Sequence, residues 1–66
     1  MVEALSGVGE VRIHIQQMDQ FGAWRTYTTQ NNQRNAYRTA ANRAAATGRR
    51  HRLISDDGTL LYLVNP

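Results

Sequence analysis

The residues of this sequence best suited to binding chemistry are its arginines. The chain has eight basic residues, all of them arginine, against five acidic residues, and its formal net charge is +3. The segment 31–52 carries six of the arginines and no acidic residue. A guanidinium group presents a planar fork of donors that matches phosphate and carboxylate oxygens. The segment therefore suits an anionic partner, although a genome rich in arginine codons produces the same composition.

Two groups of arginines have a spacing that favours contact with phosphates. Arg34 and Arg38 are one helical turn apart, and Arg49, Arg50 and Arg52 cluster around the start of a predicted strand. The first group equally fits a solvated helix flank, and the second fits charge that protects an edge strand from aggregation. The candidate contacts to a nucleic acid are Arg12, Arg34, Arg38, Arg49, Arg50 and Arg52.

The other residues with chemical potential do not form a recognisable catalytic or metal-binding set. His14 and His51 are far apart, and the sequence has no cysteine to supply a thiolate ligand or a disulfide. Asp56 and Asp57 are adjacent and followed by glycine, as in a turn. General acid–base chemistry requires a cleft that shifts a pKa, for which a domain of this size has little room. We expect no enzymatic activity, no metal or cofactor, and no small-molecule substrate.

The length of the chain limits how stable it is alone. A domain of 66 residues buries only about 60 % of the surface that its unfolded chain exposes. Disulfides, metals and oligomerisation are the usual reinforcements, and without cysteine the last of these remains open. Residues 1–9 contain no basic region or long apolar run typical of a signal sequence or membrane span. We expect a cytoplasmic protein.

Hydrophobic periodicity predicts two β-hairpins around one helix. Residues 10–18 alternate between apolar and polar, and residues 23–29 are good strand formers, with turn residues between them. Residues 50–55 and 59–64 are the second pair of strands. The alanine-rich segment 31–47 predicts a helix, with Asn31 or Thr29 as its N-cap and Gly48 as its C-terminal glycine. One side of this helix is a stripe of mostly methyl groups with Tyr37 as its bulky anchor, formed by Ala36, Tyr37, Ala40, Ala41 and Ala44. The predicted fold is a two-layer ββαββ α+β domain over 10–66, with a four-stranded, antiparallel-rich sheet, one helix on one face, and a flexible arm at 1–9.

The turns predict which residues share a face of the sheet. A three-residue loop closed by a left-handed glycine pairs Asp19 with Ala23, and Ser55 with Thr59. The face assigned to the helix then holds Val11, Ile13, Ile15, Arg25, Tyr27, His51, Leu53, Leu61 and Leu63. The opposite face holds Arg12, His14, Gln16, Met18, Trp24, Thr26, Arg50, Arg52, Ile54, Leu60, Tyr62 and Val64.

The uncovered face carries more apolar surface than a monomer usually shows to solvent. We therefore predict a protein-interaction module that binds a partner or a second copy of itself through this face. The candidate interface residues are Met18, Trp24, Ile54, Leu60, Tyr62 and Val64. The alternative is binding of RNA or single-stranded DNA, with Trp24 and Tyr62 as stacking platforms and the arginines as phosphate contacts.

Overall fold

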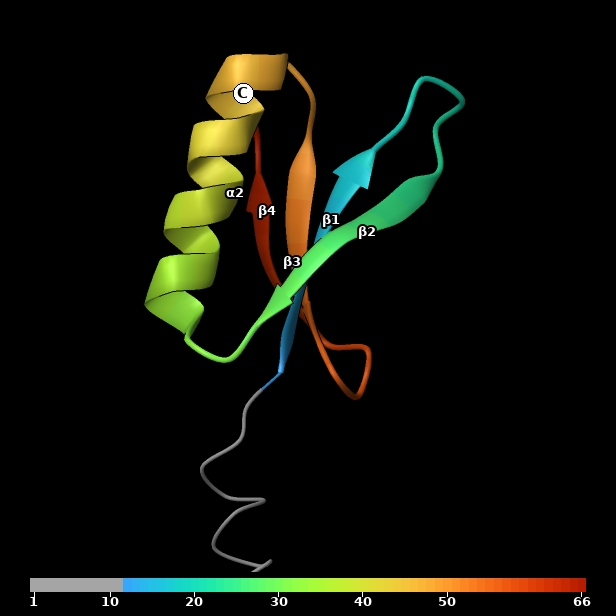
Figure 1. Cartoon of the computed structure of the whole chain (residues 1–66). Helices are drawn as coiled ribbons and strands as arrows, with labels where there is room; N and C mark the ends of the chain where they lie inside the picture. The colour runs from blue at the N-terminus through green and yellow to red at the C-terminus, as the bar shows by residue number, and fades with distance from the viewer. Residues whose placement is uncertain (1–11) are drawn as a thin grey trace, which may run out of the picture.

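The computed structural model describes residues 12–66 and has the predicted order of elements. The strands are β1 (Ile13–Met18), β2 (Trp24–Gln30), β3 (His51–Ser55) and β4 (Leu60–Val64), and the helix is α2 (Gln33–Thr47). Figure 1 shows the helix on one side of a single sheet, which confirms the two-layer α+β fold. The expected arm at 1–9, the strand start at Glu10 and the placement of Val11 lie outside the described residues.

The sheet has the order β2-β1-β3-β4, and each neighbouring pair is antiparallel. Because β2 and β3 both run antiparallel to β1, they run parallel to each other. Helix α2 makes the connection between them and so lies across the sheet face (Figure 1). The hairpins are therefore joined through β1 and β3, and β2 and β4 are the two edge strands.

The two hairpin turns have the predicted geometry. The amide of Asp19 donates to the carbonyl of Ala23 at 2.8 Å, and the amide of Ser55 donates to the carbonyl of Thr59 at 2.9 Å. Each loop ends in a glycine with positive φ, 83° at Gly22 and 90° at Gly58, where a side chain would be strained. These pairings confirm the loop length on which the face assignment depends.

An aspartate fixes each turn. The Asp19 carboxylate accepts from the amides of Ala23 and Phe21 and from Arg25 Nε, at 2.8–2.9 Å. The bond from the Ala23 amide is the main reason that the pKa of Asp19 is lowered. Hydrogen bonds from the Ser55 hydroxyl and from Thr59 lower the pKa of Asp57 to about 2. Both carboxylates therefore hold their turns in the ionised form.

The helix begins at Gln33, two residues later than predicted. Asn32, not Asn31 or Thr29, is the N-cap, and its side chain accepts from the Asn35 amide at 3.0 Å. The helix ends at Gly48, as predicted, with φ of 69° and an amide that donates to Ala44. Within residues 12–66, α2 is not long or apolar enough to cross a membrane.

The core between helix and sheet is thin. Ile13, Ile15, Leu53 and Val64 from the strands meet three alanines of α2, and all seven are buried. The alanines are Ala36, Ala40 and Ala44, which confirms the expected methyl stripe. Tyr37, predicted as the bulky anchor of that stripe, remains nearly half exposed. Because alanine contributes little apolar area, four sheet residues supply most of the hydrophobic stabilisation.

Arg43 connects helix α2 to strands β1 and β2 of the sheet. Its guanidinium lies 3.7 Å from the centre of the Tyr27 ring, and Nη2 donates to Gln17 Oε1 at 2.9 Å. These contacts join α2 to β2 and β1 at once. They combine a cation–π interaction with a hydrogen bond in a partly buried place, where both are stronger than in water.

Because β4 contains a β-bulge, the predicted assignment of its residues to the two faces of the sheet is partly wrong. Ile54 pairs with Leu60 but Leu53 pairs with Tyr62, so Leu61 is an extra residue in the strand. Beyond this point, Tyr62 and Val64 lie on the helix side and Leu63 lies on the uncovered side, opposite to the prediction for all three. A similar irregularity in β2 leaves Tyr27 unpaired, and its ring stays on the helix side as predicted.

Candidate functional site

The sheet face away from α2, called the open face below, divides into a polar half and an apolar half. Because cross-strand partners share a face, the register assigns residues from all four strands to it. The open face consists of His14, Gln16, Met18, Trp24, Thr26, Thr29, Arg52, Ile54, Leu60 and Leu63. The polar half lies on β2 and β1 and includes Arg52 of β3, and the apolar half lies at the end of β3 and on β4.

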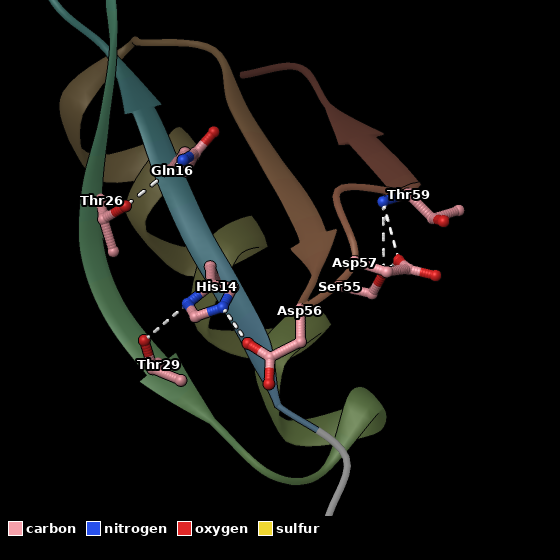
Figure 2. A network of polar contacts seen from close by, with 8 residues as sticks. All are labelled: His14, Gln16, Thr26, Thr29, Ser55, Asp56, Asp57 and Thr59. Carbon is pink, nitrogen blue, oxygen red and sulfur yellow. Dashed lines mark hydrogen bonds and ion pairs between the residues drawn. The ribbon is translucent and has the colours of Figure 1, made fainter.

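His14 is the centre of the first polar contact set. Its Nδ1 lies 2.9 Å from Thr29 Oγ1, and its Nε2 lies 2.7 Å from Asp56 Oδ1. Figure 2 shows the imidazole between the two, bridging β2 and the turn after β3. Hydroxyl, imidazole and carboxylate in a row are the groups of a hydrolase triad. The Asp56 side chain is 62 % exposed, however, and water screens its charge, so the contacts act mainly to tie the strands together.

Gln16 and Arg52 form the second polar contact set, one row further along the sheet. Gln16 Nε2 donates to Thr26 Oγ1 at 3.2 Å, as Figure 2 shows, and Gln16 Oε1 accepts from Arg52 Nε at 2.7 Å. The Arg52 guanidinium also lies 4.4 Å from the centre of the Trp24 ring. One face of the indole is therefore already occupied by a cation.

The apolar half of the open face contains two exposed leucines. It consists of Ile54, Leu60 and Leu63, called the apolar patch below. Ile54 is half-buried, whereas Leu60 is 54 % and Leu63 is 50 % exposed. Both leucines belong to β4, which has no charged residue and forms one edge of the sheet. This edge leaves one side of an apolar strand without a neighbour among residues 12–66.

The structure separates the six predicted interface residues. Met18 and Trp24 lie on the open face and are half-buried, and Ile54 and Leu60 belong to the apolar patch. Val64 is 6 % exposed, so its side chain belongs to the core and is not available to a partner. The Tyr62 ring lies 5.2 Å from that of Tyr37 on the helix side. Trp24 and Tyr62 are thus on opposite faces and do not form the predicted shared stacking surface.

The six candidate arginines are also distributed over separate places. Arg12 and Arg38 line one groove at the start of α2, and Arg34 lies in a neighbouring hollow with Tyr37 and Tyr62. Arg49 and Arg50 border a hollow near Met18, and Arg52 lies on the open face over Trp24. Among residues 12–66, Arg25 is the only arginine that forms an ion pair, with the Asp19 carboxylate. Most of the positive charge in this range therefore has no carboxylate partner there.

The two histidines lie on opposite sides of the sheet. His51 is completely buried on the helix side, with Nδ1 3.0 Å from the carbonyl oxygen of Arg49, whereas His14 is on the open face. Within the described range, no three histidine, cysteine or acidic side chains gather where they could hold a metal ion.

The polar contacts of His14 are the feature that sequence reasoning missed. Period-two alternation placed His14 on the open face, but its partners come from β2 and from the turn after β3. Asp56 reaches it only because β1 pairs with β3, and strands separated by a helix carry no local signal of their pairing. The groove that contains Arg12 and Arg38 depends on the same long-range arrangement.

Comparison with known proteins adds no assignment. No family model matches the chain, and no curated protein or solved structure shows significant similarity to it. The function must therefore be inferred from the arrangement of its residues.

Proposed function

We propose that this protein is a non-enzymatic interaction module that associates with a second copy of itself through the apolar patch and the adjoining edge of β4. One observation carries the proposal. β4 has the sequence Leu-Leu-Tyr-Leu-Val, lies at the edge of the sheet, and has two leucines about half exposed on the open face.

Natural proteins usually protect such an edge. Charged side chains, proline or a covering loop prevent pairing with another chain. Within residues 60–64 there is neither charge nor proline, and the bulge at Leu61 is the one irregularity. An edge that has kept five apolar residues without these protections is best explained by a partner that covers it.

The thin core supports self-association as well. Three of the seven core residues are alanines, so the monomer buries little apolar area for its length. Domains of this size often gain the missing stability from oligomerisation. The apolar patch and β4 contain no charged residue, and the neighbouring guanidinium of Arg52 already contacts Gln16 and Trp24.

The polar half of the open face is poorly suited to the centre of this interface. The side chains of His14, Gln16 and Arg52 already have hydrogen-bond partners within the chain. Covering them would remove water without providing new bonds, which costs free energy. The interface is therefore expected to be centred on β4, with Trp24 at its margin or outside it.

Sedimentation equilibrium over a wide concentration range tests the proposal. The parent protein is expected to dimerise, and Leu63→Lys is expected to weaken dimerisation by a factor of about 30, because each copy loses roughly 1 kcal/mol of apolar burial. Phe21→Lys is the matched control, since Phe21 is 81 % exposed in the turn between β1 and β2. A parent protein that remains monomeric at millimolar concentration contradicts the proposal, as does equal weakening by both variants.

A further inference from the structure

A polar groove lies on the side of the molecule where α2 begins. It has a volume of about 900 Å³ and lies between Arg12, the last residues of β2, the connection to α2, and the first two turns of the helix. It is separate from the apolar patch, since its lining contains no residue of β3 or β4. The self-association proposed above therefore does not depend on it.

The described side chains that line this groove are all polar or positively charged. Within residues 12–66 the lining consists of two guanidinium groups, four carboxamides and two hydroxyls, with no acidic, aromatic or large aliphatic side chain among them. The arginines come from different elements, Arg12 from the start of β1 and Arg38 from the second turn of α2. A surface of this kind offers many hydrogen-bond donors and positive charge, and offers no aromatic ring on which a base could stack.

We propose that the groove binds the sugar–phosphate backbone of a single-stranded nucleic acid without sequence preference, with Arg12 and Arg38 as the phosphate contacts. Guanidinium groups form charge-assisted bonds to phosphate oxygens, and carboxamides and hydroxyls match sugar and phosphate oxygens. The absence of aromatic residues from the lining is the reason for expecting backbone contact alone.

The surroundings of the groove favour a chain of phosphates over a single anion. Arg34 is one helical turn before Arg38 and lies in the adjoining hollow, so positive charge continues beyond the groove. The groove is open to solvent, and its lining comes from β2, from α2, from the connection between them and from Arg12. Among the described residues, no acid is part of the lining, and the Asp56 carboxylate is linked to the groove residue Thr29 through His14.

Fluorescence anisotropy with a labelled mixed-sequence 12-nucleotide RNA or DNA strand tests the proposal. Arg38→Ala is expected to weaken binding about tenfold, the value of one charge-assisted hydrogen bond, and to reduce the salt dependence by about 0.7 in logarithmic slope. Arg50→Ala is the matched control: the sequence placed Arg50 among the candidate contacts, but in the structure it is exposed near Met18 and is not part of the groove, so this proposal assigns it no phosphate contact. Arg50→Ala is expected to change affinity less than twofold.

A second variant separates binding from folding. Asn35→Asp places a carboxylate in the groove, in the first turn of α2, where a negative charge favours the helix. This variant is expected to keep its melting temperature and to lose nucleic-acid binding by tenfold or more. Retained binding in Asn35→Asp overturns the proposal.

Two further outcomes also overturn it. If Arg50→Ala weakens binding as much as Arg38→Ala does, the attraction belongs to the basic protein as a whole and not to the groove. If inorganic phosphate displaces the oligonucleotide at an equal concentration of phosphate groups, the groove is a site for single anions. Absence of any binding at 20 mM salt refutes the proposal directly.

Discussion

The bulge in β4 decides which of two adjacent residues belongs to the core, and this leads to a sharp test. Val64 is buried on the helix side, whereas Leu63, one residue earlier, is half exposed on the open face. Substituting each by alanine removes aliphatic atoms at neighbouring positions of the same strand. The two variants share the lower strand propensity of alanine, so the difference between them reports burial.

The expected magnitudes follow from that burial. Val64→Ala removes two methyl groups from a site that is 6 % exposed, at about 0.8 kcal/mol each, and leaves a small cavity. We expect a loss of about 2 kcal/mol in the free energy of unfolding. A core of this size supplies only a few kcal/mol in all, so the urea concentration at the midpoint of unfolding is expected to fall markedly in Val64→Ala. Leu63→Ala is expected to cost less than about 1 kcal/mol, because water already reaches half of its side chain.

Urea unfolding followed by circular dichroism measures both values. The protein is kept at low micromolar concentration so that association does not add to the apparent stability. Dimerisation, measured at high protein concentration, is expected to show the opposite order of effects. Leu63→Ala weakens the association of folded molecules, and Val64→Ala leaves it unchanged. If Leu63→Ala destabilises the dilute monomer as much as Val64→Ala does, the two side chains do not lie on opposite faces and the bulged pairing of β3 with β4 is wrong.

Two further predictions concern the helix packing and the acid stability. Ala40→Leu is expected to destabilise the protein by about 1–3 kcal/mol in thermal or urea unfolding, because Ala40 is fully buried between α2 and the sheet, whereas Ala45→Leu on the exposed side changes stability little. The pKa of Asp57 is lowered to about 2, so its stabilising effect is complete above the unfolded value near 4 and is lost as the pH falls towards 2. In acid titrations of unfolding, Asp57→Asn is therefore expected to show a shallower loss between pH 4 and 2, and an unchanged slope would contradict the stabilising role of this carboxylate.

Local patterns in the sequence accounted for the elements and their ends. Alternation in β1, the glycines at Gly22 and Gly58, and the alanines before Gly48 each act over a few residues, and each gave the correct element. The N-cap was displaced by one residue because neighbouring asparagines are equally capable of capping. The methyl stripe of α2 was also readable, since it follows from helical periodicity alone.

The candidate site was predicted only in part, for a physical reason. Leu60 and Ile54 were placed correctly because the turn next to them fixes their pairing. Beyond Leu61 the prediction failed for Leu63 and Val64, because a single extra residue reverses every later side chain. The sequence contains no local mark of that bulge, which forms where the strand accommodates both β3 and α2.

The sequence by itself determined the kinds of element, their order, and the positive charge of the segment 31–52. Only the tertiary structure decided that β4 is an edge, that Arg12 lies with Arg38, and that His14 meets Asp56. Helices, turns and strand periodicity arise from contacts between residues close in the chain, which a sequence displays directly. Strand order and register arise from contacts across the whole domain, where the choice depends on how the core packs as a unit.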